Sequence, residues 1–125
     1  MGKSVAVVGA SADRSKYSNK AVRAYLRAGW QVYPVNPKGG LIEGLTAYKT
    51  IEEIPAKVDR VTLYLPPAVG VGALEQISRA KPAEFFVNPG AESDELVTKA
   101  KVLGLSPVLA CSIIEIGARP GEFPD

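Results

Sequence analysis

Short apolar runs alternate along the chain with longer stretches in which apolar residues recur at helical spacing. A continuous β-branched run such as Ser4–Val8 is typical of a parallel strand that is covered on both faces. On the same grounds we expect further strands at Trp30–Val35, Asp59–Leu65, Glu84–Val87 and Pro107–Ala110. The pattern therefore predicts a sheet of about five strands.

Helical segments occupy most of the gaps between these runs. We expect a first helix after a cap at Ser18 or Asn19, a second over Ala68–Ala80 and a third after a cap at Ser93. The second helix has an apolar face made of Val69, Ala73, Leu74, Ile77 and Ala80. Each of these helices is long enough to connect two parallel strands.

Alternation of strands and helices implies a parallel sheet with helices on both faces, because each parallel connection needs a crossover. Right-handed crossovers then give an α/β, Rossmann-like, doubly wound fold in a single domain over residues 1–125. We expect strand order 3-2-1-4-5 along the sheet. The ambiguous part is Asn36–Pro55, which is rich in Gly and Pro and offers only a short helical turn at Ile51–Ile54.

Composition narrows the function. The 125 residues include 15 Lys and Arg against 13 Asp and Glu, a balance that disfavours nucleic-acid binding. Histidine is absent, which removes the commonest general base and any His-based metal site. The single cysteine, Cys111, excludes an internal disulfide and a CxxC zinc site. We therefore expect a binding protein with no catalytic residues and no metal.

The chain also offers no cleavable signal peptide and no apolar stretch long enough for a membrane span. It is therefore predicted to be cytoplasmic and not to bind membranes.

Ligands of doubly wound sheets bind at the carboxyl ends of the strands, so the residues there are the candidate site. After the first strand, Gly9 permits a tight turn, and Ala10 and Ser11 are small enough for a phosphate to approach the backbone. Lys16 adds charge, and a helix start at Ser18 or Asn19 adds free N–H groups. The alternative is an ordinary strand-to-helix loop, since the motif is not a strict GxGxxG.

The end of the second strand discriminates among nucleotides. Sites for NAD usually carry an acidic residue here, whereas this chain has Val35, Asn36, Pro37 and Lys38. Lysine suits a ligand with an additional phosphate near the ribose, namely NADP or coenzyme A (CoA). Lys38 as a solvated loop residue remains the alternative reading.

Two further strand ends complete the candidate site. Leu65, Pro66 and Pro67 form a rigid apolar shelf that suits an adenine ring or a pantetheine arm, although proline is also common at a helix start. The fourth strand is followed by Asn88, Pro89, Gly90 and Ala91, where glycine permits close approach of a ligand. The same residues also make a good turn on their own.

These motifs, in this order, resemble the small bacterial and archaeal CoA-binding proteins and the CoA-binding domain of the succinyl-CoA synthetase alpha subunit. The most specific motif is Val32–Lys38 (VYPVNPK), and the resemblance extends over about residues 4–117, ending shortly after Cys111. It implies a CoA or acyl-CoA ligand. The diphosphate would lie at Gly9–Ser11 and the start of the first helix, with Lys38 toward the 3′-phosphate.

The resemblance also implies that Val35, Pro66 and Pro67 line the adenine or pantetheine path, and that residues 88–91 flank the thiol arm. Two departures concern the thiol end. Family members often have Gln-Pro-Gly or Gln-Leu-Gly where this chain has Asn88–Gly90, and Asp-Arg-Cys where it has Leu109–Cys111. The phosphorylated histidine of the synthetase subunit has no counterpart, so its reaction is not implied.

Three functions remain open from the sequence: a noncatalytic CoA-binding protein, an NADP-dependent oxidoreductase, and a regulatory protein with a vestigial nucleotide site. The first is favoured by the motifs and by the missing histidine. Cys111 is expected at the start of a short helix, as a buried apolar residue or as a thiol able to form a mixed disulfide with CoA. The apolar tail residues Ile113, Ile114 and Ile116 suggest a homodimer.

Overall fold

The computed structural model describes residues 3–125. Its centre is a five-stranded parallel sheet made of β1 (Ser4–Val8), β2 (Gln31–Val35), β5 (Arg60–Leu63), β6 (Glu84–Val87) and β7 (Pro107–Leu109). The helices are α1 (Tyr17–Arg27), α2 (Pro67–Ala80), α3 (Asp94–Val102) and α4 (Ser112–Glu115). The predicted Rossmann-like α/β class and the single domain are confirmed.

The strand order is β2-β1-β5-β6-β7. When only the five strands of this sheet are numbered along the chain, the order is 2-1-3-4-5, so the predicted order 3-2-1-4-5 is wrong. The reason lies in the segment after β2, which forms a hairpin of β3 (Leu41–Ile42) and β4 (Leu45–Thr46) and then a short 3₁₀ helix, η1 (Ile51–Glu53). Tyr48 bridges in parallel to Val35 and so covers the edge of β2 that a third strand would need. The next strand, β5, pairs with β1 instead.

This order puts the topological switch point between β1 and β5. From β1 the chain crosses first to β2 on one side and later to β5 on the other side. The connections diverge there, and a crevice opens at the carboxyl ends of the two strands. The fold thus predicts where a ligand binds before any side chain is considered.

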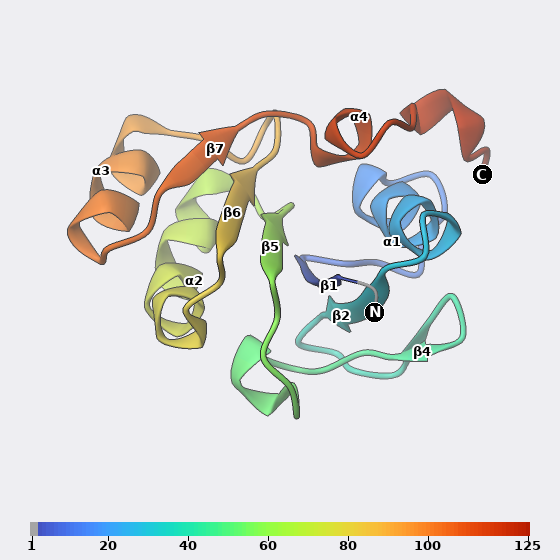
Figure 1. Ribbon diagram of the computed structural model, residues 1–125, viewed down its shortest axis with the longest axis horizontal. Helices are drawn as coiled ribbons and strands as arrows, with labels where there is room; N and C mark the ends of the chain where they lie inside the picture. The colour runs from blue at the N-terminus through green and yellow to red at the C-terminus, as the bar shows by residue number, and fades with distance from the viewer. Residues whose placement is uncertain (1–2) are drawn as a thin grey trace.

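The helices cover both faces of the sheet. α2 and α3 lie on one side with η1, and α1 lies on the other side with α4 and the second 3₁₀ helix, η2 (Pro120–Glu122) (Figure 1). Alternate residues of β1 supply both cores, since Ala6 and Val8 belong to the first and Val5 and Val7 to the second.

Three details of the helices differ from or agree with the expectations. The N-cap of α1 is Lys16, so the predicted cap at Ser18 or Asn19 is wrong, and both residues are buried in the first turn. Val69 is 56% exposed rather than on the inner face of α2. The predicted cap at Ser93 is confirmed, because its hydroxyl accepts a hydrogen bond from the Leu96 N–H. Within residues 3–125 no helix is long and apolar enough to span a bilayer.

Candidate functional site

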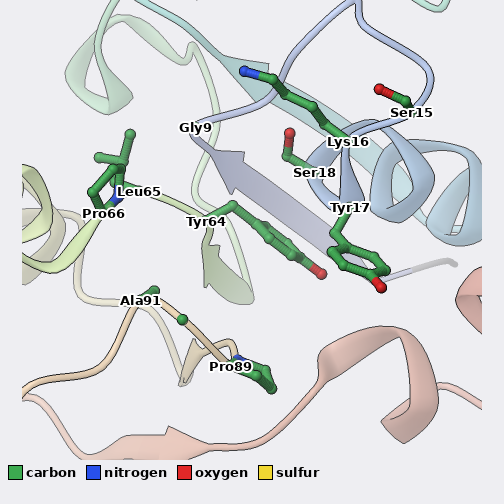
Figure 2. A pocket seen from close by; sticks show the side chains of 11 residues that line it. Gly9, Ser15, Lys16, Tyr17, Ser18, Tyr64, Leu65, Pro66, Pro89 and Ala91 are labelled. Atoms are coloured by element: carbon green, nitrogen blue, oxygen red, sulfur yellow. The ribbon is translucent and has the colours of Figure 1, made fainter.

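A cleft of about 510 Å³ lies at the carboxyl ends of β1, β5 and β6, beside the start of α1 (Figure 2). We call it the central cleft. It brings together residues from all three strand ends and from the first turn of the helix. Its walls are formed by Gly9, Ser15, Lys16, Tyr17, Ser18, Tyr64, Leu65, Pro66, Pro89, Gly90 and Ala91.

Two further cavities adjoin the central cleft. The β2-side cavity, of about 370 Å³, shares Gly9 and Leu65 with it and is otherwise lined mainly from β2, the η1 region and α2. The α4-side cavity, of about 280 Å³, shares Tyr17, Tyr64 and Pro89 with it and reaches Cys111. Because neighbouring cavities share walls, the three form a path along the carboxyl edge of the sheet that an extended ligand could follow.

The turn after β1 requires glycine. Gly9 has φ +90°, and a Cβ there would come within 3.0 Å of Leu65 Cδ2 and 3.1 Å of the Tyr64 backbone. The N–H groups of Gly9 and Ala10 both donate to the Val35 carbonyl oxygen at 3.1 Å. These two amides tie β1 to β2, so a phosphate on this turn would have to be held by other groups.

The start of α1 supplies such groups. Tyr17 and Ser18 are its first residues, and within residues 3–125 neither backbone N–H has a hydrogen-bond acceptor. Lys16 and Ser15 stand beside them in the wall of the cleft. Free N–H groups, the positive end of the helix dipole and a lysine together make this end of the cleft favourable for an anion.

Asn19 and Ser11 shape this loop rather than line a cavity. The Asn19 side chain donates to the Ser11 carbonyl oxygen at 2.9 Å and accepts from Arg23 Nε at 2.8 Å. Upstream of the helix, hydrogen bonds from Ser15 hold the pKa of the Asp13 carboxyl below its ordinary value. The loop that leads into α1 is therefore fixed by its own side chains.

Of the four predicted site residues at the end of β2, two line a cavity and two do not. Val35 and Pro37 line the β2-side cavity. Asn36 donates to the Ala10 carbonyl oxygen at 2.8 Å and accepts from the Lys38 N–H at 2.8 Å, so it braces the turn. Lys38 is exposed and lies outside the walls of the three cavities.

The remaining strand ends meet the cleft as the topology requires. Leu65 and Pro66 line it, whereas Pro67 is the first residue of α2 and lies outside the three cavities. Across the cleft, Pro89, Gly90 and Ala91 form the opposite wall.

Asn88 is 2% exposed, lines the α4-side cavity and has all its side-chain bonds inside the protein. Its amide donates to Thr62 Oγ1 at 2.6 Å and to the Leu63 carbonyl oxygen at 2.9 Å, and its oxygen accepts from the Ser112 N–H. These contacts are those of a structural residue that fixes the start of α4.

Several residues that line the cavities were not predicted from the sequence. Tyr17 and Tyr64 line both the central cleft and the α4-side cavity, and Lys49 lines the β2-side cavity. Tyr64 directly follows β5, so its place at the carboxyl end of a strand could have predicted that it lines the site. Lys49 belongs to the segment after β2 that has no regular period, so no pattern in the sequence indicated it.

A doubly wound α/β domain with a ligand cleft at its switch point is the class that this geometry defines. The chain belongs to the CoA binding domain family, whose model matches residues 3–117. This match confirms the family resemblance stated from the motifs. The family relation and the topology point to the same edge of the sheet.

Individual relatives agree with the family assignment. The chain is 38% identical over 80 residues to the alpha subunit of the ADP-forming acetate–CoA ligase I of Pyrococcus furiosus, a match that covers 59% of this chain but 17% of that subunit. It therefore spans less than a fifth of the length of that relative.

Solved structures give the same picture. A conserved hypothetical protein of Pyrococcus furiosus is 32% identical with a TM-score of 0.81, covering 92% of this chain and 99% of that one. The dinucleotide-forming acetyl-coenzyme A synthetase 1 of Candidatus Korarchaeum cryptofilum is 30% identical with a TM-score of 0.71, covering 85% of this chain and 25% of that one. The fold thus occurs both as a small protein and as part of a larger synthetase.

Proposed function

We propose that this chain is a noncatalytic CoA-binding protein. In this proposal the diphosphate binds at the start of α1, against Lys16, Ser18 and the free N–H groups of the first turn. The adenine end enters the β2-side cavity between Val35, Pro37 and Leu65. The pantetheine arm runs along the central cleft past Pro66 and Pro89–Ala91 toward α4.

The observation that carries the proposal is the anion-binding character of the helix start at the switch point. Two unbonded N–H groups and an adjacent lysine open into a cleft whose remaining walls are mostly apolar. CoA combines a diphosphate with an apolar arm, and the family is that of a CoA binding domain. A ligand without a phosphate would leave the helix start unused.

Two lysines are candidates for the 3′-phosphate. Lys38 comes from the family motif but lies on an exposed turn, whereas Lys49 lines the β2-side cavity itself. Among the described residues neither side chain takes part in an ion pair, so either is free to bind an anion. We propose that they share this role, with Lys49 the closer to the bound nucleotide.

The absence of catalysis is supported by the composition, since the chain has no histidine for acid–base work. The cytoplasmic location and the homodimer remain predictions from the sequence.

Isothermal titration of the protein with CoA, dephospho-CoA and NADP tests the proposal. We expect CoA to bind roughly tenfold more tightly than dephospho-CoA, because a charge-assisted contact to the 3′-phosphate is lost. NADP should bind more weakly than CoA, because it lacks the pantetheine arm. Failure of CoA to bind would refute the proposed function, and preferential binding of NADP would favour the oxidoreductase alternative.

Lysine variants resolve the 3′-phosphate contact. Lys49→Ala and Lys38→Ala should each reduce the affinity for CoA while leaving that for dephospho-CoA unchanged, with the larger effect for Lys49. Lys101→Ala is the matched control, since Lys101 is exposed on α3 and outside the three cavities. An unchanged ratio of CoA to dephospho-CoA affinity in both variants would contradict the assigned role.

A further inference from the structure

The α4-side cavity continues the central cleft toward α4, past the walls to which the proposed function assigns the nucleotide and the pantetheine arm. The two spaces share Tyr17, Tyr64 and Pro89, so a ligand arm leaving the cleft enters the cavity between these residues. Its volume of about 280 Å³ is just below the usual range for pockets that enclose a drug-sized ligand, so it has room for an acyl chain of several carbons.

The walls of this cavity are uncharged. Its apolar part consists of Ile113, Ile114, Pro89 and Pro120, and its polar part is limited to the two tyrosines, Cys111 and Asn88. The Asn88 amide is already committed to Thr62, Leu63 and Ser112. A charged group placed here would find no counter-ion in the wall and would lose hydration on the side that faces the buried Ile113, which is unfavourable.

One polar group at the entrance has no partner. The Tyr64 hydroxyl is buried near Ser112 and Thr62, but within residues 3–125 it forms no hydrogen bond of ordinary geometry. An unsatisfied buried hydroxyl costs free energy unless a ligand completes it. Burial raises the pKa of Tyr64, so the group stays protonated and acts as a donor.

Tyr17 lies beside Tyr64 in the walls of both cavities. Tyr17 is the first residue of α1, its side chain is 64% exposed, and it extends to the same side of the cleft as Tyr64 (Figure 2). An exposed ring at a helix start can turn aside at little cost, because it has few packing contacts to lose.

We propose that the α4-side cavity binds the short, uncharged acyl group of a CoA thioester, with the Tyr64 hydroxyl donating to the thioester carbonyl oxygen. The proposal rests on the proposed CoA-binding function and adds the ligand class: acyl-CoA with a small neutral acyl group, preferred over free CoA and over acyl groups that end in a carboxylate. The thioester carbonyl emerges where the cleft meets the cavity, and Tyr64 lines both.

Titration with CoA, acetyl-, propionyl-, butyryl- and succinyl-CoA tests this directly. We expect affinity to rise along the neutral series by up to about fourfold per added methylene, as apolar burial predicts. Succinyl-CoA, which has the chain length of butyryl-CoA and a terminal carboxylate, should bind more weakly than butyryl-CoA.

Equal affinity for CoA and the neutral acyl series, or for succinyl- and butyryl-CoA, would overturn the inference and leave CoA binding intact. Failure of CoA itself would instead refute the proposed function, and the acyl inference with it. The two failures are therefore distinguishable in one set of titrations.

The hydroxyl is tested by Tyr64→Phe. In the variant, the ratio of the affinity for acyl-CoA to that for free CoA should fall roughly three- to tenfold, the range of a single hydrogen bond. Tyr48→Phe is the matched control, because Tyr48 lies at the edge of β2 and outside the three cavities. An equal loss for CoA and acyl-CoA would contradict the contact to the carbonyl.

A gain-of-function variant covers the case in which Tyr64→Phe folds poorly. Ile114 lines the cavity but is 61% exposed, so Ile114→Lys is expected to fold and to bring a cation to the wall. The affinity ratio of succinyl- to butyryl-CoA should then rise by roughly two- to fivefold, as for an exposed ion pair. An unchanged ratio would show that the acyl group lies elsewhere.

Discussion

The two faces of the sheet are built from different chemistry. Under α2 and α3 the inward side chains are aliphatic or aromatic, among them Val61, Leu63 and Phe85. On the other face, which α1 and α4 cover, the side chains that project from β5 and its carboxyl end are Arg60, Thr62 and Tyr64. We call the first the apolar face and the second, which combines these polar side chains with an apolar core from β1 and α1, the polar face.

The polar face is satisfied almost completely. Arg60 is 2% exposed, its guanidinium bonds Glu84 and Glu115, and it lies 4.2 Å from the centroid of the Phe86 ring. Thr62 and Ser112 share a hydrogen bond of 2.7 Å that joins β5 to α4. Buried charges and hydroxyls of this kind contribute little net stability but fix one arrangement of their partners. Both faces bury apolar residues that stabilise the domain, and the polar face in addition sets where α4 and Cys111 lie.

The largest expected effect comes from the apolar face. Leu74 of α2 is fully buried there, so Leu74→Ala should lower the free energy of unfolding by about 2–5 kcal/mol. Affinity for CoA per folded molecule should not change, because Leu74 lies outside the three cavities. Denaturant unfolding and titration measure the two quantities. The control Val102→Ala, at a side chain that is 81% exposed, should cost less than about 0.5 kcal/mol.

A change on the polar face should cost less stability but move α4. Asn88→Ala removes the acceptor of the Ser112 N–H and a donor to Thr62, which is expected to cost about 1–3 kcal/mol. Since Cys111 is the single cysteine and immediately precedes α4, its rate of labelling by a thiol reagent reports the position of the helix start. The rate should rise several-fold in Asn88→Ala and remain unchanged in Leu74→Ala under folding conditions. Equal labelling rates would refute a positioning role for the polar face.

The sequence predicted the apolar face better than the order of the strands. Apolar runs predict strands because the residues that a strand buries are neighbours in the sequence. All five strands of the central sheet lie within a few residues of the predicted positions. The order depended on Asn36–Pro55, whose Tyr48 bridge to Val35 arises from hairpin geometry that no periodicity encodes. A non-periodic segment of the chain therefore determined the topology.

The site shows the same division. Gly9, Lys16, Leu65 and Pro66 were predicted from strand ends, and the cleft contains all four, because parallel strands end at one edge. Asn36 shares that edge but braces a turn. Whether a polar residue faces a ligand or the protein depends on its partners, and those come from distant parts of the chain.

The smallest expected effect is a difference between the two faces in how the free energy of unfolding depends on pH. Burial raises the pKa of Tyr25 and Tyr64, which both lie on the polar face. Tyrosine in the unfolded chain ionises near pH 10, whereas the folded protein holds these protons to higher pH. The associated stability is therefore complete below about pH 10 and is lost as pH rises toward the raised pKa, by up to ~1.4 kcal/mol per pH unit for each group.

Denaturant unfolding between about pH 9 and about pH 11 measures this loss. Tyr64→Phe should show a shallower fall than the parent chain, because one of the two groups no longer ionises in the unfolded state. The two proteins differ in no other side chain, so contributions from the rest of the chain cancel in the comparison. Parallel curves for the two proteins would mean that the Tyr64 hydroxyl ionises as readily in the folded state as in the unfolded one, and would remove the basis for treating it as a buried donor at the entrance of the α4-side cavity.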